Sequence, residues 1–120
     1  MIFIGGAGRS GTTLVRVMLD SNPSIFAGPE IKVLPQLIGM RQNWLNGMMP
    51  TLGLWGHDRE SINRLFRDAI TQLLTQPHLI NTEHGSVICE KSPNNVLFFD
   101  DLKELFPDAK FVHVYRDGRR

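Results

Sequence analysis

A glycine-rich segment near the start of the chain constrains the fold more than any other feature of the sequence. Residues 2–13 read IFIGGAGRSGTT, and the apolar run 2–4 ends in two glycines. Gly6 and Gly11 have the spacing of a phosphate-binding loop, G-x-x-x-x-G-K-[ST], but Thr12 occupies the lysine position. Backbone N–H groups at the start of a helix bind anions without a lysine. The segment therefore predicts a strand, an anion-binding loop and a helix, in that order.

Hydrophobic periodicity predicts further strands and helices along the chain. The expected strands cover residues 1–4, 87–89 and 110–115, and the expected helices cover about residues 14–19, 31–44, 58–75 and 96–106. The stretch 47–56 contains three glycines and a proline, so we expect a loop there. Strands that alternate with helices indicate an α/β fold, here a phosphate-loop type of parallel sheet with helices on both faces, in three layers.

The expected helices carry apolar faces that identify the core. On the helix expected over 31–44, one buried face is predicted to hold Val33, Leu34, Leu37, Ile38, Met40 and Trp44. Asp58 is a good N-cap for the helix that follows. Trp44 and Trp55 are expected to pack on the core or to line an acceptor groove. The single cysteine, Cys89, lies in an apolar run and is expected to be buried.

Charge and length exclude several classes of partner. A net charge of +1 gives no sign of nucleic-acid binding, so any cationic site has to be local. The 120 residues form at most one domain, and they lack the run of about 18 apolar residues that a membrane span needs, so no membrane contact is expected from this segment. The four histidines do not have metal-ligand spacing, so no metal is expected.

Cationic side chains follow or end three of the expected strands. Arg9 lies in the glycine-rich loop, Lys91 follows the strand 87–89, and Arg116 follows the last strand. Because ligands of parallel sheets bind outside the carboxyl ends of the strands, these cations are expected to surround an anion. The missing lysine normally reaches the β- and γ-phosphates of a triphosphate, beside magnesium. Its absence indicates a donor with a shorter anionic chain and no metal.

Four segments together resemble the sulfotransferases that use 3′-phosphoadenosine 5′-phosphosulfate (PAPS), and most closely the tyrosylprotein branch. The segments are GGAGRSGTTLVRVMLDSNP, GPEIKVLP, EKSPNN and FVHVYRDGR, and the resemblance covers nearly the whole chain. It implies that Arg116 binds the 3′-phosphate of PAPS. It implies that the 5′-phosphosulfate is bound by Gly8, Arg9, Ser10, Gly11, Thr12 and Thr13. The family sheet extends further, so residues 1–120 look like the N-terminal part of a sulfotransferase domain.

The resemblance also implies a reaction, the in-line transfer of a sulfuryl group from PAPS to an acceptor hydroxyl on a peptide or a small molecule. Glu30 falls where the tyrosylprotein enzymes carry a catalytic glutamate, and it would act as general base. Lys91 and Arg9 would stabilise negative charge on the departing phosphate. Pro29 and the pair 31–32 differ from the acidic residue and the Thr-Arg pair of the tyrosylprotein pattern, so a tyrosine acceptor is one candidate.

Other interpretations stay open at the level of the sequence. Glu30 would also suit a helix N-terminus, and Lys91 would also suit the surface end of a strand. A nucleotide or small-molecule kinase would need Lys32 or Lys91 in place of the missing lysine, and a non-catalytic nucleotide-binding remnant would need neither. The expected location is the Golgi lumen for a tyrosylprotein enzyme with a missing anchor, and cytoplasmic for a chain complete at Met1.

Overall fold

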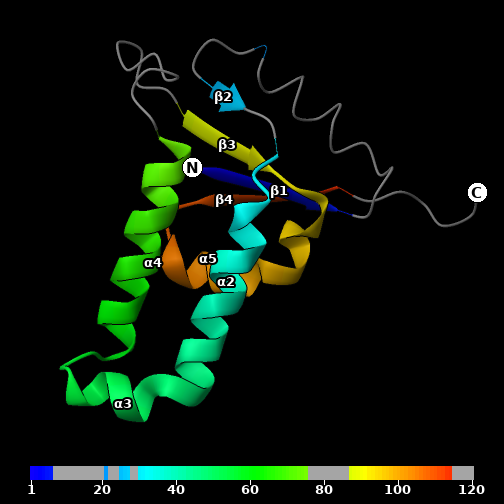
Figure 1. Ribbon diagram of the computed structural model, residues 1–120. Helices are drawn as coiled ribbons and strands as arrows, with labels where there is room; N and C mark the ends of the chain where they lie inside the picture. The colour runs from blue at the N-terminus through cyan, green and yellow to red at the C-terminus, as the bar shows by residue number, and fades with distance from the viewer. Residues whose placement is uncertain (7–20, 22–24, 28–29, 76–86, 115–120) are drawn as a thin grey trace, which may run out of the picture.

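The computed structural model describes residues 1–6, 21, 25–27, 30–75 and 87–114. Their strands form one parallel sheet in the order β2-β3-β1-β4 (Figure 1). The strands are β1 (Ile2–Gly6), β2 (Ile25–Ala27), β3 (Val87–Lys91) and β4 (Lys110–Val114). The predicted parallel α/β sheet is confirmed, and β2 adds a strand that was not predicted.

The register of the strands decides which residues lie together near the carboxyl ends of the strands. Ile4 of β1 lies opposite Lys91 of β3 and opposite Val112 of β4. All the paired strands run in the same direction, so their carboxyl ends lie together. We call this end of the sheet its functional edge, because ligands of parallel sheets bind there. β3 extends two residues beyond the predicted 87–89, and Lys91 is therefore the last residue of the strand.

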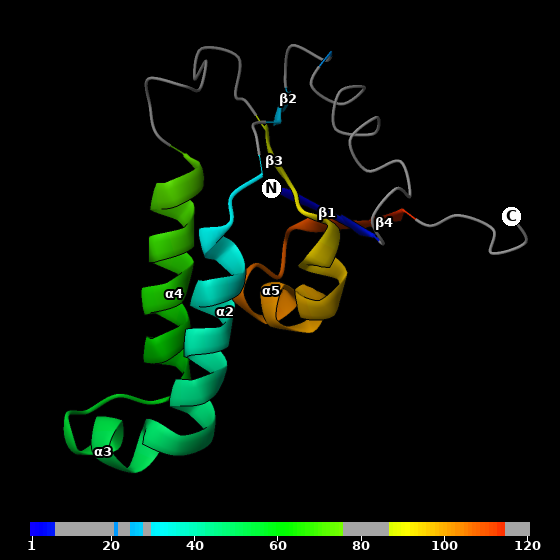
Figure 2. The ribbon, with the colours of Figure 1, turned by 45° about the vertical axis from the view of Figure 1, so that its right-hand side comes forward.

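The described helices pack on one face of this sheet, with α2 (Val33–Asn43) beside α4 (Arg59–Leu74) and α5 (Phe99–Leu105) (Figures 1 and 2). Phe3 of β1 joins their apolar side chains in the main core. The other buried members of that core are Leu34, Ile38, Ile62, Phe66, Ile70, Leu102 and Leu105. Ile4 and Cys89 form a smaller apolar cluster, and Cys89 is buried as predicted. The helix predicted over 14–19 lies outside the described residues.

The prediction of a loop over 47–56 is wrong. After α2 the chain forms a π-helical turn, Trp44–Met48, and then α3 (Met49–Leu54), which joins α2 to α4 at the end far from the sheet (Figure 2). Pro50 lies in the first turn of α3, where the N–H that proline lacks has no helical partner to lose. Only Gly56 has a positive φ, of 87°, among the described glycines, and it follows the helix end.

Two further helices begin in different ways. Asp58 caps α4 as predicted: its Oδ1 accepts from the backbone N–H of Ser61 at 2.8 Å, and the Ser61 hydroxyl accepts from the backbone N–H of Asp58 at 3.0 Å. The helix predicted over 96–106 instead starts as a 3₁₀ helix, η3 (Pro93–Phe98), and becomes α-helical only at Phe99.

The buried face of α2 differs from the predicted face. Leu34 and Ile38 are buried, but Val33 and Met40 are exposed. The third buried side chain of α2 is Arg41, which is only 1% exposed. Apolar periodicity cannot reveal a buried arginine, because its burial depends on partners from other elements.

Those partners come from two neighbouring helices. Arg41 donates from Nε to Asn63 Oδ1 at 2.9 Å, from Nη1 to Asp101 at 2.7 Å and from Nη2 to Glu104 at 2.6 Å. Arg59 also donates to both carboxylate oxygens of Glu104, at 2.8 and 2.7 Å. Arg41 thus joins α2 to α4 and α5 through charged hydrogen bonds within the helical layer.

Candidate functional site

Glu30 and Lys91 meet at the carboxyl end of β3. The Lys91 side chain is nearly buried, with 8% of the residue exposed, and its Nζ donates to Glu30 Oε1 at 3.2 Å. The two residues are 61 positions apart in the sequence. The structure therefore brings together two of the three predicted catalytic residues and pairs their opposite charges.

The simpler roles considered for these two residues do not fit the structure. Lys91 is buried, so it is not a surface lysine at a strand end. Glu30 precedes α2 rather than opening it: the N-cap of α2 is Lys32, and the first turn of α2 contains no acidic residue. The Glu30 carboxylate instead bonds to a side chain of the sheet.

A buried carboxylate that was not among the predicted site residues lies next to this pair. Glu90 is 3% exposed, and its Oε1 accepts from the Ser92 hydroxyl at 2.6 Å and, at the long distance of 3.5 Å, from the backbone N–H of Ile31. Its Oε2 accepts from Asn95 Nδ2 at 2.5 Å. Burial raises the pKa of Glu90, and the hydrogen bonds from Asn95 and Ser92 oppose that rise.

Asn95 connects this carboxylate to the end of β1. Its Nδ2 also donates to the carbonyl oxygen of Ile4 at 3.1 Å, and the backbone N–H of Ser92 donates to the same oxygen at 3.2 Å. A Cβ on the next residue, Gly5, would lie 2.6 Å from the backbone nitrogen of Val96. Only glycine allows this approach, so the strand that leads into the glycine-rich loop is held closely against η3.

A cavity of 300 Å³ opens beside these groups, between the end of β3 and the start of α2. Its lining combines a carboxylate, an ammonium group and neutral polar side chains. The lining residues are Glu30, Ile31, Lys32, Pro35, Ser92 and Asn94. Because Glu30 faces it at the functional edge of the sheet, this cavity is the candidate acceptor pocket.

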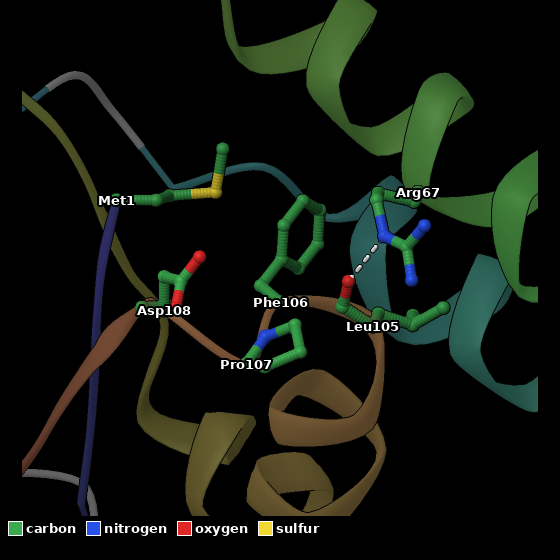
Figure 3. A pocket seen from close by; sticks show the side chains of 7 residues that line it. Met1, Arg67, Leu105, Phe106, Pro107 and Asp108 are labelled. Carbon is green, nitrogen blue, oxygen red and sulfur yellow. Dashed lines mark hydrogen bonds between the residues drawn. The ribbon is translucent and has the colours of Figure 1, made fainter.

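A larger cavity, of 410 Å³, lies at the opposite edge of the sheet (Figure 3). Met1 and Ala109, which precede β1 and β4, contribute to its wall beside Phe106. Arg67 of α4 donates from Nε to the Leu105 carbonyl oxygen at 2.5 Å there. Ligands of parallel sheets bind at the carboxyl ends of strands, so this cavity is at the wrong edge for the expected chemistry.

The remaining predicted site residues lie outside the described residues. They are Gly8, Arg9, Ser10, Gly11, Thr12, Thr13 and Arg116. The strands before them are described: β1 ends at Gly6 and β4 at Val114, and these two residues are register partners. The donor-binding roles of the seven residues stay predictions.

The described part of the chain also bears on the predictions for the two tryptophans, for metal binding and for a membrane span. Trp44 packs on Phe66, with ring centroids 5.0 Å apart, whereas Trp55 is 82% exposed and does not pack on the core. The alternative that Trp55 lines an acceptor groove stays a prediction. In the ranges that the structure describes, no three His, Cys, Asp or Glu side chains gather to hold a metal ion. None of the helices described has the length and hydropathy needed to cross a bilayer.

A parallel sheet in which a glycine-rich sequence follows the inner strand β1, and a buried lysine ends the neighbouring strand β3, fits a phosphate-loop type of α/β fold. The sequence model described as the sulfotransferase family matches residues 2–120, and the chain belongs to that family. Membership in this family does not favour the kinase interpretation.

The chain is also similar in sequence to protein-tyrosine sulfotransferases of several animals. The protein-tyrosine sulfotransferase of Drosophila melanogaster is 38% identical over 121 residues, which cover 99% of this chain and 23% of the relative. Protein-tyrosine sulfotransferase 1 of Homo sapiens is 35% identical over 120 residues, 99% of this chain and 32% of the relative. Protein-tyrosine sulfotransferase A of Caenorhabditis elegans is 33% identical over 98% of this chain and 30% of the relative. The chain spans at most about a third of the length of these relatives.

Proposed function

We propose that this chain is part of a PAPS-dependent sulfotransferase whose acceptor is the hydroxyl of a protein tyrosine. The observation that carries the proposal is the pairing of Glu30 with Lys91 at the functional edge of the sheet, in a chain that belongs to the sulfotransferase family. The tyrosine acceptor is supported by the names of the relatives. In this proposal residues 1–120 form the N-terminal part of the sulfotransferase domain.

In the proposed reaction the acceptor oxygen bonds to sulfur while its proton passes to the carboxylate of Glu30. A tyrosine hydroxyl has an unperturbed pKa of about 10, so it is protonated at neutral pH and benefits from a nearby base. The bond between sulfur and the bridging phosphate oxygen breaks, and Lys91 stabilises the negative charge that develops on that oxygen. Lys91 bonds to Glu30 at 3.2 Å, and it would exchange this bond for one to the donor.

The donor would be held at the neighbouring strand ends. We assign the 5′-phosphosulfate to the loop residues Gly8–Thr13 with Arg9, and the 3′-phosphate to Arg116. Support comes from the motifs GRSGTT and VYRDGR and from the register pairing of Gly6 with Val114, the residues at which β1 and β4 end. A helix N-terminus and an arginine are both suited to such anions.

Turnover by the full-length protein tests the proposal. Purified protein is incubated with PAPS and either a tyrosine-containing peptide or a simple phenol, and the sulfated product is measured by mass spectrometry. We expect transfer to the peptide. Transfer to the phenol but never to the peptide would remove the tyrosylprotein assignment. No transfer to either, together with magnesium-dependent phosphate transfer from ATP, would replace the sulfotransferase by a kinase.

A further inference from the structure

Glu90 occupies a position where an apolar side chain would be expected. Its register partner in β1 is Phe3, a member of the main core, and side chains at paired positions of parallel strands point to the same face of the sheet. A carboxylate at such a position costs free energy unless hydrogen bonds compensate for its lost hydration. The structure therefore has a buried carboxylate, 3% exposed, that the proposed reaction does not itself use.

The donors to Glu90 belong to three different parts of the site. Ile31 follows Glu30, so its N–H belongs to the segment that carries the proposed base. Ser92 follows Lys91, so its hydroxyl belongs to the segment that carries the proposed cation. Asn95 bonds to the Ile4 carbonyl oxygen, so it connects Glu90 to the strand before the glycine-rich loop.

We propose that Glu90 is a positioning residue for sulfuryl transfer, and that its carboxylate aligns Glu30, Lys91 and the end of β1 through Ile31, Ser92 and Asn95. The inference rests on the proposed function. A buried network in which one carboxylate accepts from three separate segments favours one arrangement of those segments, and catalysis is sensitive to displacements of about 1 Å. Glu90 acts through its neighbours and touches no reacting atom in this account.

The orientation of the Asn95 side chain requires a hydrogen-bond acceptor at Glu90 Oε2. The two hydrogens of Nδ2 point to two acceptors, the Ile4 carbonyl oxygen and Glu90 Oε2. Among the described residues no donor reaches Asn95 Oδ1, which is fully buried. A glutamine at position 90 would place an amide NH₂ or a weaker acceptor against Nδ2, with almost no change in volume. Glu90→Gln therefore disturbs the network without opening a cavity.

The test compares the full-length parent with Glu90→Gln. We measure kcat and KM for the peptide, the affinity for the donor product 3′-phosphoadenosine 5′-phosphate, and the thermal midpoint. Misplacement of the base and the cation should lower kcat on the order of 10–100-fold while the variant still folds and binds the donor product. Ser92→Ala removes one donor and should lower kcat less. In the double variant the two losses should combine to less than their product, because both act through one network.

Glu104→Gln is the matched control, because Glu104 is a carboxylate with several donors in the helical layer. We expect it to lower the thermal midpoint and leave kcat unchanged. A folded Glu90→Gln variant with parental kcat would overturn the inference, and so would an equal loss of kcat in Glu104→Gln. If Glu90→Gln does not fold, parental kcat in Ser92→Ala overturns it instead. A parent that neither binds donor product nor transfers a sulfuryl group overturns the proposed function, and this inference with it.

Discussion

Two groups of polar side chains, each around a buried residue, hold this molecule together in different ways. The helical cluster lies between α2, α4 and α5, and its members are Arg41, Arg59, Asn63, Asp101 and Glu104. The strand-end cluster lies at the carboxyl edge of the sheet, and its members are Glu30, Glu90, Lys91, Ser92 and Asn95. The first has arginines between carboxylates, whereas in the second the buried Glu90 has neutral donors alone and Lys91 pairs with Glu30.

The pKa values of the two central carboxylates move in opposite directions. Hydrogen bonds from Arg59 first, and then from Asn63 and Arg41, lower the pKa of Glu104 to about 2. Burial raises the pKa of Glu90. The fold therefore stabilises the charge on Glu104 and disfavours the charge on Glu90. The carboxylate whose charge is disfavoured, Glu90, lies beside the proposed catalytic pair, and the carboxylate whose charge is stabilised, Glu104, joins the helices.

The largest effect is expected at Glu30, in the strand-end cluster. Glu30→Gln keeps the shape of the side chain but removes the proposed base, so turnover should fall by ~10²–10⁴-fold. Donor affinity and the thermal midpoint should change little, because Glu30 is partly exposed and lies outside the helices. Steady-state kinetics and a thermal scan of one variant measure both. Near-normal turnover on the acceptor that the parent uses would remove Glu30 from the mechanism.

In the helical cluster the largest effect is expected at Arg41. Arg41→Met fills most of the same volume but leaves Asp101 and Glu104 without their buried partner. Breaking a buried pair in this way should lower the free energy of unfolding by about 3–5 kcal/mol. Denaturant titration of the full-length protein gives the value. A loss smaller than that caused by removing an exposed charge would show that the helical cluster does not stabilise the fold.

The opposite pKa shifts predict opposite dependences of stability on pH. Because the pKa of Glu104 is lowered from 4.5 to about 2, its stabilising effect is complete above pH 4.5 and is lost as the pH falls toward 2. Because the pKa of Glu90 is raised from 4.5, its contribution becomes less favourable as the pH rises above 4.5. The free energies of unfolding of parent, Glu104→Gln and Glu90→Gln, compared across pH, measure both slopes. Slopes of the same sign would refute the contrast.

The smallest effect is expected at Arg59, on the rim of the helical cluster. Arg59 also bonds to Glu104, but its side chain is 61% exposed. Water and salt screen such a pair, so Arg59→Met should cost only about 0.2–1 kcal/mol of unfolding free energy, and less at high salt. Denaturant titrations at low and high salt test this expectation. A cost equal to that of Arg41→Met would mean that exposure does not separate the two arginines.

Local sequence signals predicted the elements whose causes are local. The apolar run before the glycines predicted β1, the cap at Asp58 predicted α4, and the resemblance to a known family placed Glu30 and Lys91 in one site. The loop over 47–56 was mispredicted because proline and glycine were counted without regard to their place in the helical turn.

The residues that escaped prediction are those whose roles depend on distant partners. Arg41 is buried because Asp101 and Glu104, about 60 positions away, neutralise it. In the sequence, Glu90 is a polar residue that follows an apolar run, and nothing marks it as buried. Only its contacts with Ile31 and Asn95 reveal the strand-end cluster. Hydrophobic periodicity contains no information about such pairs.

We expect the strand-end edge of this sheet to bind a sulfate donor without a metal. Calorimetric titration of the full-length protein with 3′-phosphoadenosine 5′-phosphate, in the absence of magnesium, tests it most directly. We predict binding that magnesium does not alter, and a loss of about 1.5–3 kcal/mol of binding free energy on Arg9→Ala or Arg116→Ala, the range for hydrogen bonds to charged groups. Magnesium-dependent binding of ATP, with no response to the bisphosphate, would contradict the account.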